Sequence, residues 1–378
     1  MFEMSAMISR ALSVLLFSFV VAGKAPGDIS SCRKSIYLPY AEKFSAKFTP
    51  TIKGQIKGKD YTIPVDTGGT GLLIGASKLS TIPKSEGTFG VEYLSSSSNL
   101  YTGRFVNISI TFPGKNNNTA HAKVPALIVD SAVVCPSYNV TKGDGKCPDP
   151  TPETKNIDDI LYMGVGFGRN TQGSGLPYAI PSHNPFLNVR SINGKKVGKK
   201  NYCNGYTVST KGIYLGLTPR NTDQYNWVKL DRGSTPDPRD WAMVRTSFKV
   251  DDRGSFSGAA LIDTGIPQMY VQAYPAGSIP NVTVKDTFHG PSKEGRDITL
   301  VKEGTHLDFG FPALGADGGV VGYDFRVGDK KFKSQPAWVQ PVTLGSGPHV
   351  NTGRKFLYGF SVAFDAVGGR FGFKCLRC

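Results

Sequence analysis

Histidine is scarce in this chain, and its placement argues against the commonest metal sites. Only five histidines occur among 378 residues, with no His-x-x-x-His pair and no cysteine–histidine spacing typical of zinc. The serine-hydrolase elbow Gly-x-Ser-x-Gly is also absent. The glycine-rich run at residues 164–168 does not match the dinucleotide fingerprint Gly-x-Gly-x-x-Gly. We therefore expect no metal and no cofactor.

Long apolar runs are missing after residue 22, so we expect no segment that crosses a membrane. At the N-terminus, Arg10 precedes a short apolar stretch at residues 11–21, and the small residues Ala22 and Gly23 follow. This order is typical of a secretory signal peptide, which we place at residues 1–22. A buried helix of the fold is the alternative. The first interpretation predicts a secreted, extracellular protein.

The six cysteines form an even set, which in a secreted chain predicts three disulfides. Cys135 and Cys147 flank a loop with Pro, Gly and Asp, and they are the best candidates for a local bridge. Cys375 and Cys378 lack the strand-to-helix setting of a redox pair, so we expect them in structural disulfides. Four Asn-x-Ser/Thr sequons are candidate glycan acceptors, at Asn107, Asn117, Asn139 and Asn281.

Acidic residues are outnumbered, with 29 Asp and Glu against 44 Lys and Arg, giving a net charge of +15. The basic residues are dispersed, and no zinc-finger, helix-turn-helix or aromatic RNA-binding pattern accompanies them. We therefore expect no nucleic-acid partner. The charge favours solubility or a loose attraction to acidic surfaces and substrates.

Sustained helical periodicity is rare, because 45 glycines and 25 prolines interrupt the chain every few residues. Between these breaks lie short runs rich in β-branched and aromatic residues, which predict an all-β fold with many turns. A polar stretch near residues 218–225 predicts a boundary between two halves. We assign residues 23–220 to the first half and residues 221–378 to the second.

The chain contains two Asp-Thr-Gly triplets, one in each half. Val65 precedes the first triplet, Asp66-Thr67-Gly68, and Ile262 precedes the second, Asp263-Thr264-Gly265. Another apolar run follows each triplet after a few residues. A lone triplet means little, because Asp and Gly are common in turns. Two copies in matching apolar frames predict two loops that bring one carboxylate each to a shared cleft.

Two carboxylates about a hydrogen bond apart can hydrolyse a peptide bond without a metal. Like charges that close cannot both ionise, so the pair shares one proton. The ionised member takes a proton from water, and the protonated member donates to the carbonyl oxygen. Such a pair needs glycine where the backbone must approach closely. Each threonine supplies a hydroxyl that can lock the two loops together.

With these motifs the chain resembles the pepsin-like aspartic peptidases over nearly the whole length after residue 23. The resemblance implies an all-β, bilobal fold with an active-site cleft between two lobes. It implies that Asp66 and Asp263 are catalytic, and that Thr67, Gly68, Thr264 and Gly265 support them. The further segments that resemble the family are residues 48–74, 89–103, 160–168, 212–216, 241–250, 353–365 and 369–372. In the segment at residues 89–103, which resembles the flap hairpin, Tyr93 is the candidate flap tyrosine and Tyr101 the second choice.

The chain also departs from the family pattern. Gly69 and Ile266 follow the triplets where the family carries Ser or Thr, whose hydroxyl donates to the outer carboxylate oxygen. Losing such a donor removes roughly 1–3 kcal/mol of support for the charged form, so the pair should titrate higher. Arg354 stands where an Asp is usual, and Val350-Asn351-Thr352 is less apolar than the family pattern. The stretch between Gly23 and Asp66 is too short for both the first strands and a full inhibitory pro-segment.

The resemblance predicts a secreted aspartic endopeptidase that binds extended protein or peptide substrates and acts as a monomer. The intact pair of aspartates favours this interpretation. The alternative is a catalytically weak or inactive binding protein of the same shape, such as an enzyme inhibitor or a decoy. Gly69, Ile266, the basic charge and the short N-terminal stretch favour the alternative.

Overall fold

The computed structural model describes residues 28–94, 97–170, 178–198, 201–275, 277–289, 295–343 and 347–376. The predicted signal peptide lies outside the described residues. Within these ranges the chain forms strands and short 3₁₀ helices, and no α-helix is present. The all-β prediction is confirmed. No helix in the described residues has the length and apolarity needed to cross a membrane.

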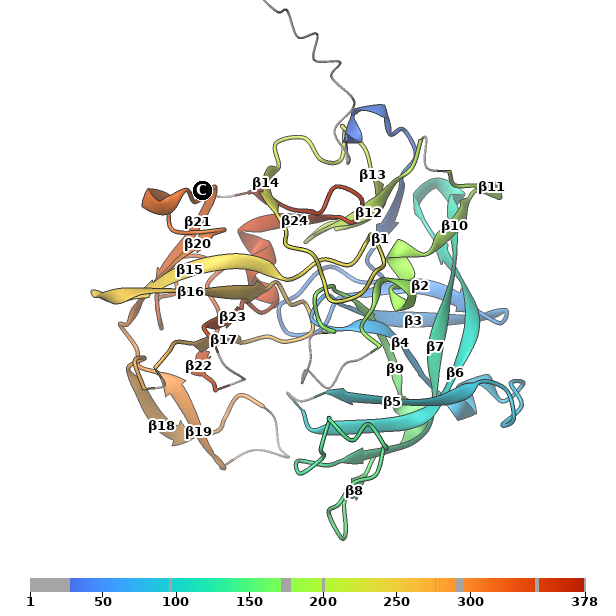
Figure 1. Cartoon of the computed structure of the whole chain (residues 1–378), viewed down its shortest axis with the longest axis horizontal. Coiled ribbons are helices and arrows are strands. Elements are labelled where there is room, and N and C mark those ends of the chain that lie inside the picture. Colours follow the sequence, from blue (N-terminus) through green and yellow to red (C-terminus); the bar gives the residue numbers. More distant parts are fainter. Residues whose placement is uncertain are drawn as a thin grey trace, which may run out of the picture.

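A ten-stranded sheet, on the right of Figure 1, is built from residues 51–196. Its strands are β2 (Thr51–Ile56), β3 (Lys59–Asp66), β4 (Thr70–Gly75), β5 (Thr88–Leu94), β6 (Asn99–Pro113), β7 (Thr119–Val134), β8 (Glu153–Thr154), β9 (Leu161–Val165), β10 (Val189–Ile192) and β11 (Lys195–Lys196). Their order is β11-β10-β7-β4-β9-β3-β2-β6-β5, and β8 pairs with β7. In β6, Val106, Ile108, Ile110 and Phe112 alternate with more exposed residues, as expected for a strand with one face on the core.

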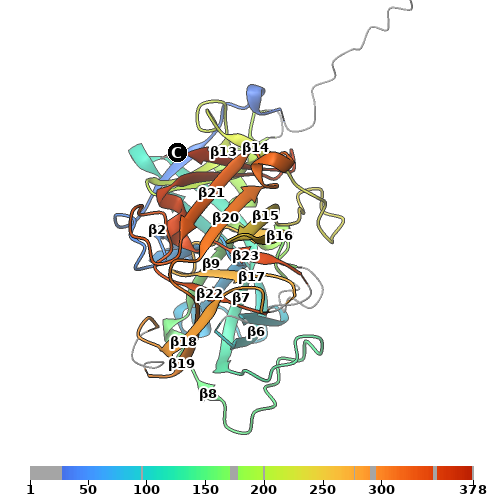
Figure 2. The ribbon, with the colours of Figure 1, turned by 90° about the vertical axis from the view of Figure 1, so that its left-hand side faces the viewer.

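A seven-stranded sheet, on the left of Figure 1, is built from residues 244–351. Its strands are β15 (Val244–Val250), β16 (Arg253–Leu261), β17 (Met269–Gln272), β20 (His306–Phe311), β21 (Val321–Arg326), β22 (Val339–Pro341) and β23 (His349–Asn351). Their order is β21-β20-β15-β16-β23-β17-β22. A separate hairpin of β18 (Asn281–Lys285) and β19 (Asp297–Val301) lies at the lower end of the molecule in Figure 2.

The third sheet joins the two halves of the chain. Its strands are β1 (Ile36–Pro39), β12 (Cys203–Ser209), β13 (Gly212–Leu217), β14 (Asn226–Lys229), β24 (Phe360–Asp365) and β25 (Arg370–Cys375). Their order is β1-β13-β12-β24-β25-β14, so β12 from the first half pairs with β24 from the second. Beneath this sheet Phe167 stacks on Phe364 with ring centroids 3.9 Å apart. One hydrophobic core therefore runs through all three sheets.

Short 3₁₀ helices connect the strands. They are η1 (Ile29–Ser31), η2 (Ala76–Leu79), η3 (Lys115–Asn117), η4 (Ile157–Asp159), η5 (Pro181–His183), η6 (Pro185–Leu187), η7 (Gly315–Asp317) and η8 (Arg354–Tyr358). Prolines at the first position of η5 and η6 suit helix starts, where the missing N–H has no partner to lose.

One strand arrangement occurs twice. β9 lies between β3 and β4, parallel to β3 and antiparallel to β4. β23 lies between β16 and β17, parallel to β16 and antiparallel to β17. In each case the two outer strands are consecutive in sequence, and the loop that joins them carries an Asp-Thr-Gly triplet. The fold thus places the two triplets in equivalent positions.

The described residues contain the one disulfide that the sequence predicted as a pair. Cys135–Cys147 forms the predicted local bridge, and Cys32–Cys203 ties the segment before β1 to β12. Cys375 is also disulfide-bonded, whereas Cys378 lies outside the described residues. All four sequon asparagines are exposed, so their use as glycan acceptors stays a prediction that the fold permits.

The two described disulfides should differ in their effect on stability. Cys32–Cys203 spans 171 residues and Cys135–Cys147 spans 12. In the chain-entropy account, stabilisation grows with the logarithm of loop length, which gives a difference of about 2 kcal/mol. We expect Cys32→Ser/Cys203→Ser to lower the free energy of unfolding by about 2–5 kcal/mol, and Cys135→Ser/Cys147→Ser to lower it less. Guanidinium unfolding measures both, and a larger loss from the short loop would contradict the expectation.

Candidate active site

The two Asp-Thr-Gly loops meet between the ten-stranded and seven-stranded sheets. Asp66 is the last residue of β3, and Asp263 lies two residues after β16. Asp263 is only 6% exposed and Thr264 only 1%. Apolar strands on both sides of each loop fix its ends, because every residue of β4 is buried and Met269 and Val271 of β17 are fully buried.

The two threonines interlock the loops through reciprocal hydrogen bonds. The Thr67 backbone N–H donates to Thr264 Oγ1 at 3.0 Å, and the Thr264 backbone N–H donates to Thr67 Oγ1 at 3.0 Å. Each hydroxyl then donates across to the opposite loop, Thr67 Oγ1 to the Ile262 carbonyl at 2.6 Å and Thr264 Oγ1 to the Val65 carbonyl at 2.8 Å. The sequence predicted that the two threonine hydroxyls would lock the loops together, and the structure places Thr67 and Thr264 in contact.

The first glycine of each motif makes room for the opposite carboxylate. A Cβ on Gly68 would lie 2.4 Å from Asp263 Cγ, and a Cβ on Gly265 would lie 2.3 Å from Asp66 Oδ2. Each glycine also donates its N–H to the aspartate of its own motif, at 2.5 Å to Asp66 Oδ1 and at 2.6 Å to Asp263 Oδ1. The four predicted residues Asp66, Asp263, Gly68 and Gly265 thus form one compact, nearly symmetric group.

Two further residues, neither of them predicted from the sequence, lie against the carboxyls. Asn351 donates from Nδ2 to Asp263 Oδ2 at 2.7 Å. The Tyr162 hydroxyl acts as a side-chain hydrogen-bond partner of the Asp66 carboxyl and lies where a side chain at Gly69 would project. The expectation that Ile266 leaves Asp263 without an outer donor is corrected, because the Asn351 amide supplies one.

The surroundings of Asp66 disfavour its charged form. Burial raises the pKa of Asp66, and the neighbouring charge of Asp263 raises it further. The Gly68 N–H and the Tyr162 hydroxyl oppose the shift by stabilising the ionised carboxylate. A raised pKa beside a second carboxyl favours a pair that shares one proton, which is the state needed for acid–base hydrolysis.

Arg354 is a buried cation that braces the second loop. Its side chain is 3% exposed, and Nε donates to the Thr264 carbonyl at 2.9 Å. Nη2 donates to Thr49 Oγ1 at 3.1 Å and to the Gly265 carbonyl. Burial lowers the pKa of Arg354, and the nearby charges of Asp263 and Asp66 oppose that shift. Arg354 therefore links the loop of the second triplet to Thr49, in the segment before β2.

The β5–β6 hairpin carries the two candidate tyrosines, Tyr93 and Tyr101, on opposite faces. Tyr93 points toward the Cys135–Cys147 loop, where its hydroxyl donates to the Cys135 carbonyl at 3.1 Å and its ring lies 5.1 Å from Tyr138. On the other face, Glu92 is paired in register with Tyr101, which packs in the same cluster as Tyr162. Tyr93 therefore faces the disulfide loop, whereas Glu92 and Tyr101 lie on the opposite face of the hairpin, and a flap role for Tyr93 or Tyr101 stays a prediction.

Glu92 is a third buried carboxyl near this group. It is 3% exposed, and its Oε1 has no hydrogen-bond partner among the described residues. Burial raises the pKa of Glu92 to about 8, although the charge of Arg169 opposes the shift. Its charge in turn helps to raise the pKa of Tyr162. A sequence signal for Glu92 was present, because this carboxylate lies between the apolar residues Val91 and Tyr93 of β5.

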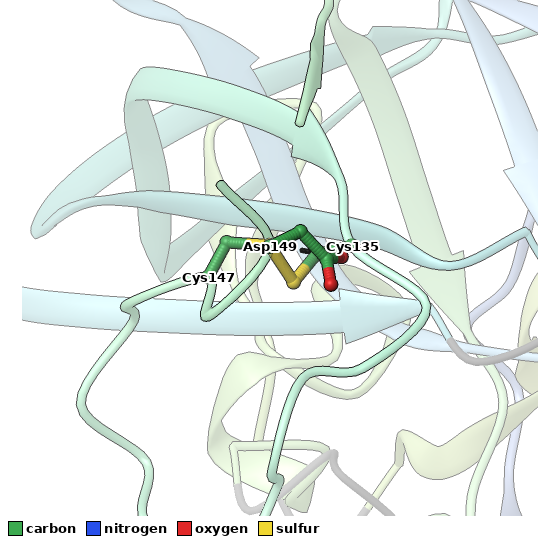
Figure 3. A group of neighbouring side chains, drawn as sticks. All are labelled: Cys135, Cys147 and Asp149. Carbon is green, nitrogen blue, oxygen red and sulfur yellow. Dashed lines mark hydrogen bonds between the residues drawn. A yellow bond between two sulfur atoms is a disulfide. The ribbon is translucent and has the colours of Figure 1, made fainter. Parts of the chain in front are cut away.

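Among the described residues, one group has the composition of a metal site: Cys135, Cys147 and Asp149. Figure 3 shows that the two sulfur atoms are bonded to each other and that Asp149 lies beside them. A disulfide provides no thiolate ligand, so this group is a structural crosslink.

In comparisons with known proteins, the sequence matches no protein-family model and no curated protein.

The raised pKa of Glu92 predicts a pH-dependent cost in stability. Its ordinary pKa is 4.5, so between pH 4.5 and about 8 the folded chain binds more protons at this site than the unfolded chain. The stability from this group is complete below pH 4.5 and is lost as the pH rises through about 8. We expect Glu92→Gln, which stays neutral, to raise the Tm at pH 8 by a few degrees but not at pH 4; 1 kcal/mol corresponds to about 2–4 °C.

The exposed Glu86 provides the matched control for this comparison. Glu86→Gln should change the Tm equally at both pH values. Thermal unfolding followed by circular dichroism measures all three proteins. A Glu92→Gln effect of the same size at pH 4 and pH 8 would contradict the assigned charge state.

Proposed function

We propose that this chain is a secreted aspartic endopeptidase of the pepsin-like kind, with Asp66 and Asp263 as the catalytic pair. The observation that carries the proposal is the pair itself: two aspartates from equivalent loops, interlocked by Thr67 and Thr264. Each has a glycine from the opposite loop against its carboxyl. Two carboxyls held this close, one buried and one half-buried, disfavour each other's charged form, and such unfavourable electrostatics are typical of functional sites.

The strand arrangement supports the same proposal. Each catalytic loop has a third strand inserted between its flanking strands, and the six-stranded sheet takes strands from both halves. In this proposal the ten-stranded and seven-stranded sheets are the cores of two lobes, with the cleft between them. The boundary near residue 220 falls between β13 and β14.

The proposed reaction uses the two carboxyls in alternate roles. The ionised carboxylate takes a proton from a water molecule, which attacks the peptide carbonyl carbon, while the protonated carboxyl donates to the carbonyl oxygen. Collapse of the tetrahedral intermediate then returns a proton to the leaving amine. The Gly68 and Gly265 N–H groups hold one oxygen of each carboxyl in place throughout. The β5–β6 hairpin would cover an extended substrate and exclude water from the reacting carbonyl.

Cleavage of a denatured protein across about pH 3–7 tests this proposal. We expect the purified chain without residues 1–22 to cleave it, and a statine-containing inhibitor such as pepstatin to block cleavage. Asp263→Asn should reduce the rate by about 10⁴-fold or more, because it removes one member of a catalytic unit. The matched control is Asp252→Asn, an exposed aspartate in the turn before β16, which should retain full activity.

The outcome that contradicts the proposal is the absence of cleavage at every pH by a protein that unfolds cooperatively. That result would favour the binding-protein alternative, whose partner would then be sought by affinity capture. Cleavage that persists equally in Asp263→Asn would point to a contaminating peptidase and would also contradict the assignment.

A further inference from the structure

We propose that Tyr162 and Asn351 are the positioning residues of the aspartate pair, each lying against the carboxyl of one aspartate. The inference rests on the proposed function and concerns the same site. Ordinarily the family places a hydroxyl residue directly after each Asp-Thr-Gly triplet, where this chain has Gly69 and Ile266. Here the donor has moved from the loop to the inserted strand in both halves.

The two residues occupy equivalent places in the fold. Tyr162 lies on β9 and Asn351 on β23, the strands inserted beside the two catalytic loops. Tyr162 lies two residues before Gly164, and Asn351 lies two residues before Gly353. Both glycines pack against the backbone of the loop on their own side. A Cβ on Gly164 would lie 2.5 Å from the Gly69 carbonyl carbon, and one on Gly353 would lie 2.0 Å from the Gln268 carbonyl oxygen.

Near Asp66, the Tyr162 hydroxyl fits only because residue 69 is a glycine. A Cβ at Gly69 would lie 1.9 Å from the Tyr162 hydroxyl oxygen, so the phenol occupies the volume of the missing side chain. The ring is held by its neighbours in a cluster with Leu73, Tyr101 and Leu127. A side chain at position 69 would therefore displace the hydroxyl from Asp66.

On the second carboxyl, the orientation of the Asn351 amide is fixed by its own partners. Its Oδ1 accepts a hydrogen bond from the Gly353 N–H at 3.0 Å, which leaves the NH₂ group facing Asp263 Oδ2 at 2.7 Å. Asn351 is 7% exposed, so this amide competes with little solvent. A buried amide held in this way is a donor to Asp263 and cannot accept from it.

Both groups act on the ionised form of the pair. A hydrogen bond to a carboxylate favours its charged state and fixes the rotation of the carboxyl plane. Asp263 has Oδ1 bound to the Gly265 N–H and Oδ2 bound to Asn351, so its carboxyl cannot rotate freely. Asp66 has Oδ1 bound to the Gly68 N–H, and the Tyr162 hydroxyl is a second partner of its carboxyl. The two donors thus compensate for the departures at Gly69 and Ile266, and the Tyr162 hydroxyl opposes the burial that raises the pKa of Asp66.

Removal of the Tyr162 hydroxyl provides the test. We expect Tyr162→Phe to move the pH profile of kcat upward by about one unit and to lower kcat about tenfold at the wild-type optimum, with little change in KM. Tyr61→Phe is the matched control, because the Tyr61 hydroxyl donates to the Lys78 carbonyl at 3.1 Å. The control should leave the pH profile unchanged.

A rescue variant separates positioning from packing. Gly69→Ser alone should be impaired, because its side chain would collide with the Tyr162 hydroxyl. In a Tyr162→Ala background the same change restores a hydroxyl beside Asp66, so Gly69→Ser/Tyr162→Ala should be at least fivefold more active than Tyr162→Ala. Asn351→Leu should shift the profile upward as Tyr162→Phe does. A rescue variant no better than Tyr162→Ala would overturn the assignment of Tyr162.

Carboxyl titration by NMR, with ¹³C-labelled aspartate, makes the test independent of activity. The resonances lost in Asp66→Asn and Asp263→Asn identify the pair, and their midpoints should rise in Tyr162→Phe but not in Tyr61→Phe. Unchanged midpoints would overturn the inference even if the enzyme is active. Raised midpoints in a protein that cleaves nothing would support the positioning role while contradicting the proposed function.

Discussion

The reciprocal hydrogen bonds between Thr67 and Thr264 are the interaction on which the rest of the site depends. The backbone N–H of each threonine donates to the hydroxyl oxygen of the other. Each hydroxyl then donates to a backbone carbonyl just before the opposite triplet. This lock fixes two loops from different sheets at one separation. Only with that separation fixed do Gly68 and Gly265 fit against the opposite carboxyls. The six-stranded sheet and its shared core then hold the two larger sheets in the positions that the lock requires.

Such a site is costly in stability. It gathers Asp66, Asp263 and Glu92 close together, and burial raises the pKa of Asp66 and of Glu92. Arg354 offsets part of that cost, since it places a cation within the field of both aspartates and satisfies the Thr264 and Gly265 carbonyls. Concentrating unfavourable electrostatics in one place is typical of functional sites.

Much of the fold class and the centre of the site could be predicted from sequence. Local signals sufficed for the all-β class and for Asp66, Asp263 and their neighbouring Thr and Gly residues, because each motif lies within five residues of an apolar run. Tyr162 and Asn351 were missed because about ninety residues separate each from the aspartate it contacts, and only the inserted strands bring them close. The sequence did contain a signal for each of these two residues. Tyr162 interrupts the apolar run before Gly164, and Asn351 is a polar residue next to the apolar Val350. The choice between Tyr93 and Tyr101 could not be made from sequence, since successive strand residues face opposite sides and a shift of one residue reverses the face.

A crystal structure of the chain without residues 1–22 bound to pepstatin would test the catalytic pair in a single experiment. We expect an extended inhibitor beneath the β5–β6 hairpin, with its statine hydroxyl within about 2.6–3.2 Å of a carboxyl oxygen of both Asp66 and Asp263. Tyr162 and Asn351 should remain against the two carboxyls. An inhibitor bound away from the two carboxyls, or no binding at saturating concentration, would contradict the central claim.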